Sequence, residues 1–407
     1  MSSLLDHAAP VVLRLMRKRH LSVPHFGMES VPGRMPEPAK QREVRFSDFE
    51  QVASLKERGG LGKDSLANWR RLWKDNPALA LAKSPLSMGW VLETAQGIVG
   101  YQGSIPLLYQ IGTRALIAAA GTSLVVEPAY RARSIGLLGS FYHQPSVDLL
   151  LITTAVAAVG ELSKALQAKI LPQRNYDTVL FWVLDAERFA TALARKLRLS
   201  GGVAAVATIL GSLALKTDMR IRSRYAFRPP NRVQLSQIEV KDIGYDFEEL
   251  WRRKLAEKPR LLADRSPASL KWHFAVPGSF SNAVVFCCRK LKRLIGYAVL
   301  RHAVDHETGM RRSLLADIFV EQDDPNVTES LVAEAYSSAL RSGDHVFEVL
   351  GLPRHVRQTM MRWNPYLRTY PAFPFFYKTN GESLARILAD EDVWYAGPFD
   401  GDTTLIP

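Results

Sequence analysis

The chain has 407 residues and a formal net charge of +13 at pH 7; 47% of its residues are hydrophobic and 23% are charged. This balance is typical of folded globular proteins and excludes a disordered or collagen-like chain, while the length favours two domains over one. Cys287 and Cys288 are the two cysteines, and adjacent cysteines rarely bond to each other, so the composition favours a reducing compartment.

The N-terminal residues 1–44 form a predicted arm. They include the Pro- and Gly-rich stretch VPGRMPEPAK and a short basic amphipathic helix over Val11–Arg19. The first twenty residues place their basic side chains after the apolar ones, the reverse of a secretory signal. No run reaches the roughly 18 apolar residues of a membrane span. We therefore expect a cytoplasmic protein.

Residues 45–185 show the periodicities of a mixed α/β domain. Leu66, Trp69, Leu72 and Trp73 recur at helical spacing, and residues 88–111 alternate as two strands around a turn at Ala95–Gly97. The elements predicted in this domain are a helix at 64–77, strands at 88–111, 115–126 and 147–156, a helix at 158–170 and a strand at 177–184.

Residues 186–232 form a predicted basic helical linker. Residues 188–232 contain ten basic side chains and one acid, Asp218, so this stretch alone carries a net charge of +9. A helix at 187–199 is followed by the apolar run 201–215, which is shorter than a bilayer-spanning helix. Two interpretations stay open: docking on an anionic membrane surface, or a helical hairpin packed between the domains.

The order of elements recurs after residue 233, which indicates an ancient internal duplication. The recurring segments are 266–274, 292–303, 313–336, 345–352, 354–363 and 373–378. We predict a second domain over 233–390 and a C-terminal tail over 391–407. The fold class is therefore α/β (α+β), with two mixed-sheet domains in tandem.

One junction carries a chemical signal, the sequence LVVEPAYRARSIGLLGSF at residues 124–141. A strand ends near Pro128, two arginines follow, and a helix begins near Gly136. The first turn of a helix has free backbone N–H groups and the positive end of the helix dipole, both of which favour an anion such as phosphate. Glycine lets the backbone approach a ligand closely because it has no Cβ.

This junction resembles the acyl-coenzyme A loop of the GNAT acyltransferases, [Arg/Gln]-x-x-Gly-x-[Gly/Ala], with Ser134 in place of the first glycine. The resemblance implies two GNAT-like domains and an acyl-CoA-dependent N-acyltransferase, most simply one that uses acetyl-CoA. The coenzyme-binding residues that it implies are Val126, Arg131, Ala132, Arg133, Ser134, Ile135 and Gly136. The second copy has Asp323 and Asp324 at the matching place, where they would repel a pyrophosphate, so we expect one coenzyme site.

The catalytic residues are less distinct. In this family a carboxylate often takes the proton of the amine, and Glu127, next to the loop, is the candidate base. Asp317 and Glu348 of the second copy are alternatives. No metal site is predicted, because the clusters at His302–His306 and Asp400–Asp402 lack enough ligands in a suitable geometry.

The acceptor is predicted to be an amine. The acidic-aromatic tail resembles those of proteins of bacterial surface-polysaccharide synthesis and so points to an amino sugar, with the enzyme peripheral at the inner membrane face. Two other classes stay open. One is a FemAB-like aminoacyltransferase that takes its acyl group from aminoacyl-tRNA, with the basic segment meeting the RNA. The other is a catalytically inactive binding or scaffold protein.

Overall fold

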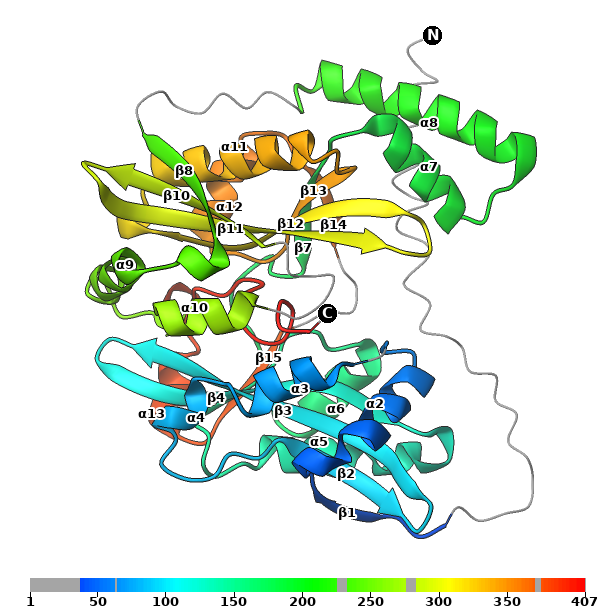
Figure 1. The fold of residues 1–407 in the computed structure, drawn as a ribbon, viewed down its shortest axis with the longest axis vertical. Coiled ribbons are helices and arrows are strands. Elements are labelled where there is room, and N and C mark those ends of the chain that lie inside the picture. The colour runs from blue at the N-terminus through cyan, green and yellow to red at the C-terminus, as the bar shows by residue number, and fades with distance from the viewer. Residues whose placement is uncertain (1–36, 63, 225–232, 276–282, 370–374, 407) are drawn as a thin grey trace. The chain divides into compact units, whose positions relative to one another are not determined.

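The structure, a computed structural model, describes residues 37–62, 64–224, 233–275, 283–369 and 375–406. The predicted helix at Val11–Arg19 lies outside these residues. The described chain divides into two compact units, each built on one mixed sheet (Figure 1). We call them unit A (residues 37–177, 243–275 and 375–406) and unit B (residues 178–224, 233–242 and 283–369).

The sheet of unit A has the strand order β1-β2-β3-β4-β5-β15-β6, and β9 pairs with the far end of β3. Strands β1 to β4 are antiparallel, β4 and β5 are parallel, and β15 is antiparallel to both β5 and β6. The strands are β1 Lys40–Glu43, β2 Gly89–Thr94, β3 Gly97–Ile111, β4 Arg114–Val126, β5 Leu149–Ile152, β6 Lys169–Ile170, β9 Leu261–Ala263 and β15 Phe376–Thr379.

Helices cover both faces of this sheet. Trp69 of α3 packs on Tyr101 of β3, whereas Phe141 of α5 lies on the opposite face, against Gly121 of β4. The helices of unit A are α2 Phe49–Arg58, α3 Leu66–Trp73, α4 Ala78–Leu81, α5 Ser134–Tyr142, α6 Ala157–Ala165, α9 Tyr245–Leu255, α10 Pro267–Phe274 and α13 Glu382–Ile387, with 3-10 turns η1 Phe46–Asp48, η2 Pro128–Arg133 and η5 Glu391–Val393.

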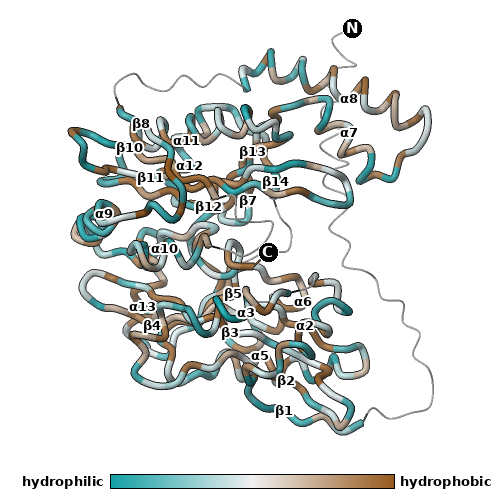
Figure 2. The backbone as a smooth tube through the Cα atoms, viewed as in Figure 1, coloured by the Kyte–Doolittle hydropathy of each residue, from teal (hydrophilic) through white to brown (hydrophobic). Residues whose placement is uncertain are grey.

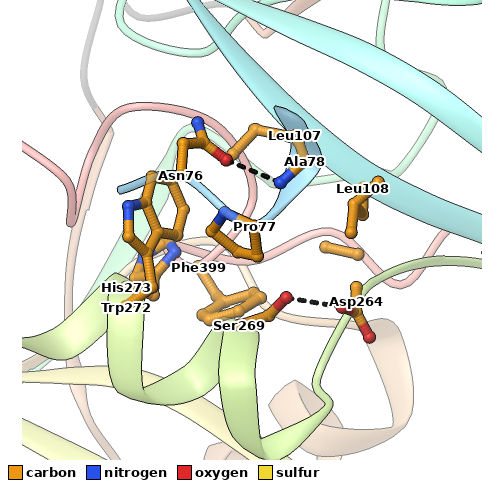
Figure 3. Close-up of a pocket in the computed structure, with 11 residues that line it drawn as sticks. Asn76, Pro77, Ala78, Leu107, Leu108, Asp264, Ser269, Trp272, His273 and Phe399 are labelled. Carbon is orange, nitrogen blue, oxygen red and sulfur yellow. Dashed lines mark hydrogen bonds between the residues drawn. The ribbon is translucent and has the colours of Figure 1, made fainter. Parts of the chain in front are cut away.

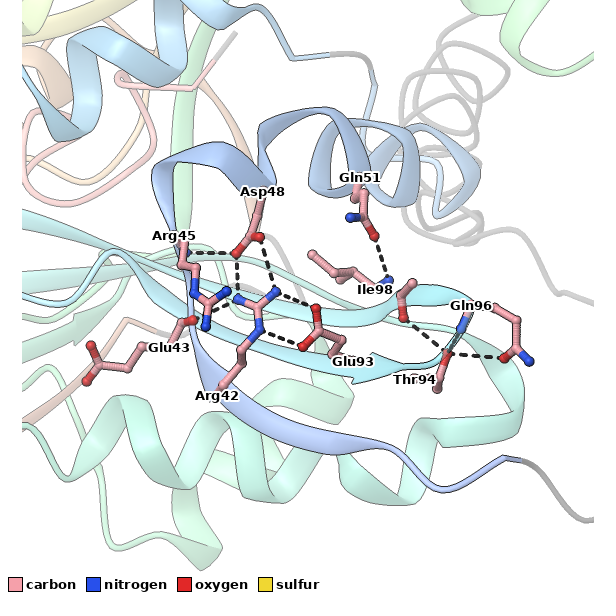
Figure 4. A network of polar contacts seen from close by, with 10 residues as sticks. Arg42, Glu43, Arg45, Asp48, Gln51, Glu93, Thr94, Gln96 and Ile98 are labelled. Atoms are coloured by element: carbon pink, nitrogen blue, oxygen red, sulfur yellow. Dashed lines mark hydrogen bonds and ion pairs between the residues drawn. The ribbon is translucent and has the colours of Figure 1, made fainter.

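An arginine fastens the edge strand β1 to its neighbours (Figure 4). Arg42 donates hydrogen bonds to Asp48 of η1, at 2.7 and 3.1 Å, and to Glu93 of β2, at 2.8 and 2.7 Å. Burial alone would raise the pKa of Asp48, but the bonds from Arg42 lower it overall. The hydrogen bonds that Arg42 donates to Glu93 likewise lower the pKa of Glu93. This network therefore stabilises unit A while both carboxylates are ionised.

Unit B repeats the pattern of one parallel pair within an otherwise antiparallel sheet. Its order is β14-β7-β13-β12-β11-β10-β8, with β12 and β13 parallel. The strands are β7 Thr178–Val183, β8 Gln234–Glu239, β10 Val284–Lys290, β11 Arg293–Asp305, β12 Met310–Val320, β13 Val346–Val349 and β14 Tyr366–Thr369. The helices are α7 Ala186–Lys196, α8 Gly201–Ile221, α11 Pro325–Arg341 and α12 Arg354–Met361, with turns η3 Val240–Asp242 and η4 Glu321–Asp323. Leu331 and Val332 of α11 lie in the unit's main core cluster.

The predicted mixed α/β class with two mixed sheets is confirmed, but the units do not follow the predicted domain boundaries. Strand β7, expected to be the last strand of the first domain, pairs with β13 and β14 of unit B. Strand β15, expected in the second domain, pairs with β5 and β6 of unit A. Their apolar patterns identify buried strands without specifying the sheet. The internal duplication stays a prediction.

The linker also differs from the expectation. Helix α8 does not end with the apolar run at Leu215 but continues to Ile221. Its last turns are held because Leu215 and Met219 pack against a core cluster of unit B. By length and composition alone, this helix of 21 residues is long and apolar enough to cross a membrane.

Candidate active site

The two parallel strands of unit A, β4 and β5, stop pairing at a defined point. Their pairing runs from Ala118 and Leu149 to Ala120 and Leu151, and β4 then continues to Val126 paired with β3 but not with β5. Within this continuation Ser123 has φ 55°, and the register with β3 shifts between Tyr101 and Gly103. Such a bulge redirects a strand and leaves backbone groups outside the ladder. A gap thus opens beside β4, bounded by the end of β5.

The C-terminal tail of the described chain fills this gap with a carboxylate. Thr153, just after β5, donates its hydroxyl hydrogen bond to Asp402 Oδ1 at 2.8 Å, and Thr154 donates to the same oxygen at 3.2 Å. The Thr122 hydroxyl on β4 also bonds to this carboxylate. Gly401 permits the approach: its φ is +95°, and a Cβ there would clash with Thr153. Asp402 therefore stands between the diverging strands.

Burial sets the electrostatics of this carboxylate. Asp402 is only 6% exposed, and desolvation raises its pKa above the ordinary value, although the three threonine hydroxyls pull in the opposite direction. A carboxylate with a raised pKa is a stronger base than a solvated one. The hydroxyl of the next residue in the chain, Thr403, has no hydrogen-bond partner among the described residues.

The neighbouring tail carboxylate, Asp400, is bound to the scaffold through other groups. It accepts a hydrogen bond from the Tyr109 hydroxyl at 3.1 Å and from the Gly397 backbone N–H at 2.8 Å. The Arg265 guanidinium lies 3.8 Å from its Oδ2. Both tail carboxylates are thus held by protein groups, but only Asp402 lies at the strand divergence.

Aromatic groups line the same face of the sheet. The Tyr101 hydroxyl and the Thr122 methyl group both occupy the space that a Cβ on Gly103 would need, so they are neighbours. Burial, and then the charge of Asp64, raises the pKa of Tyr101 well above its ordinary value. The indole N–H of Trp69, whose ring lies 6.2 Å from that of Tyr101, has no hydrogen-bond partner within the described chain. Such groups add donors that remain protonated at neutral pH.

The predicted coenzyme loop follows β4 directly. Val126 ends the strand, Arg131, Ala132 and Arg133 lie in the 3-10 turn η2, and Ser134, Ile135 and Gly136 open α5. From Arg131 to Gly136 every residue except Ser134 is exposed. The strand–loop–helix junction is therefore present, and it lies at the end of the strand that passes Asp402.

The two arginines of this loop differ in their contacts. Arg131 forms no ion pair among the residues that the structure describes, while Arg133 Nη2 donates to the Ala39 carbonyl oxygen at 3.2 Å. The Ser134 hydroxyl donates to the Arg131 carbonyl at 2.5 Å and so does not cap the helix. A Cβ on Gly136 would lie 3.1 Å from Gln41 Oε1, so Gln41 is the side chain that faces this glycine.

The other predicted carboxylates are already paired. Glu127 lies 2.9 Å from Arg58 Nη2 in a partly exposed ion pair. In unit B, Asp317 accepts a hydrogen bond from Tyr297, and Glu348 pairs with Arg312 and Arg368.

The helix start of unit B that matches the loop by position is capped from within. Asp324 Oδ1 accepts hydrogen bonds from the backbone N–H groups of Asn326 and Val327, at 2.8 and 3.3 Å. Asp323 pairs with His355 at 3.2 Å. A carboxylate thus already occupies the anion position of α11.

A small hollow also opens in unit A, along the tail (Figure 3). It holds about 310 Å³ of empty space, open solvent included, and Phe399 of the tail forms one wall. Trp272 and His273 of α10 line another side, and Asp264 lies opposite them. His273 is stacked on Phe399 with ring centres 4.1 Å apart and bonds to Thr404, so these groups also hold the tail in place.

Within the described residues, no group of three or more His, Cys, Asp or Glu side chains is arranged to hold a metal ion. His302, one of the residues considered from the sequence, pairs instead with Asp344 at 2.6 Å. Asp400 and Asp402 bind protein groups, as described above.

The fold is that of the GNAT-type N-acyltransferases. Solved structures similar to this chain include a GCN5-related N-acetyltransferase from Anabaena variabilis ATCC 29413, with TM-score 0.51 and 11% identity over 84% of this chain and 73% of that chain. The N-myristoyltransferase of Saccharomyces cerevisiae with bound myristoyl-CoA is also similar, with TM-score 0.50 and 11% identity over 86% of this chain and 81% of that one. No protein-family model and no curated protein matches the sequence. At such identities the likeness establishes the fold.

Sequence reasoning singled out the loop but not the carboxylate at the strand divergence. In the sequence, Asp402 stands out only as a possible metal ligand, because the DGD triplet has no catalytic signature of its own. Two of its threonine partners, Thr153 and Thr154, lie 249 and 248 residues away along the chain. The sequence holds only an indirect signal for Asp402: if the polar tail is buried, its carboxylates need hydrogen-bond partners.

Proposed function

We propose that this chain is an acyl-CoA-dependent N-acyltransferase whose site lies in unit A. The observation that supports this most strongly is the buried carboxylate of Asp402, held between the diverging strands β4 and β5. The exposed loop with Arg131 and Arg133 follows at the end of the same strand. A base beside β4 and an anion site at the end of the same strand are what transfer from a phosphate-bearing thioester to an amine requires.

Each group then has a distinct task. Asp402 takes the proton as the amine nitrogen attacks the thioester carbonyl, the C–N bond forms, and the C–S bond breaks to release the thiolate. The hydroxyl groups of Thr153 and Thr154 orient the carboxylate. A backbone N–H of the bulged segment of β4 stabilises the oxyanion of the tetrahedral intermediate. Asp402 replaces Glu127 as our candidate base, because Glu127 is paired with Arg58.

The donor and the acceptor are proposals at a finer level. Acetyl-CoA is the simplest donor, and the similarity to an enzyme solved with myristoyl-CoA makes longer acyl chains the second choice to test. We propose an amine acceptor and, more narrowly, an amino sugar. A screen of acyl-CoA chain lengths against amino sugars and simple amines separates these choices.

Titration calorimetry with acetyl-CoA and longer acyl-CoA species tests the proposed donor. We expect binding that weakens in the double variant Arg131→Ala, Arg133→Ala, because charge-assisted contacts contribute about 1.5–3 kcal/mol each. Arg114→Ala is the matched control, since Arg114 is an exposed arginine at the other end of β4. Ser134→Gly restores the family residue and should be tolerated or should tighten binding.

Two outcomes would redirect the proposal. Unchanged affinity in a folded double variant would remove the loop from the coenzyme site. Absence of binding to any acyl-CoA would leave the scaffold interpretation, and salt-sensitive binding of aminoacyl-tRNA in its place would favour the FemAB-like alternative.

A further inference from the structure

Helix α8 presents a continuous apolar face to solvent. Val203, Val206, Ile209, Leu210 and Leu213 are between 56% and 65% exposed, and we call these five residues the α8 strip. Their spacing of three or four residues places them on one side of the helix. Figure 2 shows hydrophobic residues recurring along α8. Five large aliphatic side chains in one contiguous strip exceed the scattered exposure that is normal for a protein surface.

The opposite side of the same helix is fastened to unit B. Gly211 lies against α7, where a Cβ added to it would be 3.6 Å from Ala190 Cβ. Leu215 and Met219 pack against a core cluster that includes residues of β7. Asp218 pairs with Arg224 at 2.8 Å and accepts a hydrogen bond from Tyr366. The α8 strip is therefore the outer face of an anchored helical hairpin.

Basic side chains continue the α8 strip. Lys216 and Arg220 follow Leu213 by three and seven residues, which is the same side of the helix. Arg198 lies exposed in the turn between α7 and α8. In the part of the chain that the structure describes, these three cations form no ion pair. Apolar and cationic groups thus share one surface.

We propose that the α8 strip docks unit B on an anionic lipid bilayer, with α8 lying in the plane of the interface. The apolar side chains enter the boundary between headgroups and acyl chains, and the lysine and arginines meet anionic headgroups. The composition favours lipid over a protein partner, because protein interfaces are enriched in aromatic residues and depleted of lysine at their centre. The α8 strip is aliphatic and is bordered by Lys216.

An in-plane helix agrees with the packing better than a spanning one. Crossing a bilayer would strip Leu215 and Met219 from their core cluster and would carry Asp218 away from Tyr366. It would also place charged residues of the last turns in the hydrocarbon layer, which is unfavourable. This surface belongs to unit B, whereas the proposed transfer site belongs to unit A, so either proposal can fail without the other.

Vesicle flotation tests the docking with the full chain. Vesicles of phosphatidylcholine alone are compared with vesicles that contain about one third phosphatidylglycerol, across a salt series. We expect binding to the anionic vesicles at low salt and release as salt rises. The double variant Lys216→Gln, Arg220→Gln should weaken this binding about 25-fold, because each basic residue contributes a factor of about five.

The apolar part is tested by Leu210→Glu, which should reduce vesicle binding at least tenfold. Leu291→Glu is the matched control, because Leu291 is a 94% exposed leucine elsewhere in unit B and should leave binding unchanged. Thermal unfolding and circular dichroism confirm that both variants fold. Absence of vesicle binding, binding indifferent to lipid charge, or equal losses in both variants would overturn the proposal. Self-association that Leu210→Glu abolishes, without vesicle binding, would assign the α8 strip to a second copy instead.

Discussion

Replacing Asp402 by asparagine is the sharpest test of the candidate site, because the two side chains have nearly the same shape. Asparagine keeps an oxygen that can accept the Thr153 hydrogen bond, 2.8 Å long in the native chain, but it cannot take a proton from an amine near neutral pH. A positioned general base contributes about 10²–10⁴-fold in rate, or about 2.7–5.5 kcal/mol of activation free energy. We expect kcat/KM to fall by that factor while acyl-CoA affinity stays unchanged.

The pH dependence gives an independent signature. Burial raises the pKa of Asp402 in the folded chain above its unfolded value. The stability that this shift contributes is present at pH values below the unfolded pKa and is lost as the pH rises through the folded pKa. The Asp402→Asn variant has no carboxyl to titrate at this position. Its free energy of unfolding should therefore decrease less than that of the native chain as pH rises. Native activity should instead rise with pH as the carboxyl ionises.

The assay follows release of the coenzyme thiol from pH 5 to 9, with the amine that gives turnover, alongside thermal unfolding of each variant. Asp400→Asn is the control: it removes a charge from the Tyr109 and Arg265 contacts, so it should destabilise the fold but keep the acid limb of the activity profile. A folded Asp402→Asn enzyme that retains kcat/KM within tenfold of native would refute the assignment and leave Asp402 as an anchor of the tail.

Three further outcomes are expected. Calorimetry with acyl-CoA should give one site per chain, because Asp324 already caps the matching helix of unit B; a stoichiometry of two would contradict this. Arg42→Met should make the free energy of unfolding depend less on pH in the acid range. The lowered pKa values of Asp48 and Glu93 stabilise the fold at pH values above the unfolded pKa, and this stability is lost as pH falls; an unchanged acid denaturation curve would count against the network. Gly89→Ala should cost about 1–3 kcal/mol in urea unfolding, because φ is +124° and a Cβ would clash with the backbone of β3; an unaltered midpoint would show that the strand relaxes freely.

Much of the secondary structure could be predicted from local sequence patterns. The helical spacing of Trp69, Leu72 and Trp73 corresponds to α3, and the alternation in 88–111 corresponds to β2 and β3. The junction after β4 has the predicted strand–loop–helix form, because Pro128 ends the strand and the residues from Ser134 onward favour a helix. These features depend on neighbours within about ten residues, which is the range over which hydrophobic periodicity and turn chemistry act.

Features that depend on residues far away in the sequence could not be predicted from these local patterns. The exchange of β7 and β15 leaves their apolar patterns unchanged, since a buried strand has the same side chains in either sheet. The role of Asp402 depends on Thr153, which lies 249 residues away. The full length of α8 depends on the packing of Leu215 and Met219, whereas the apolar count along the sequence stops at Leu215.

The exchanged strands also impose an order of events on a growing chain. Until Phe376–Thr379 has been synthesised, β5 has an unpaired edge, and the gap beside β4 lacks its tail. During that interval the open edge is a template for the same strand from another copy, the situation from which domain-swapped dimers arise. Cutting the chain near residue 185 or 232 would separate each sheet from a strand that it needs, so halves expressed together should assemble where halves expressed singly aggregate.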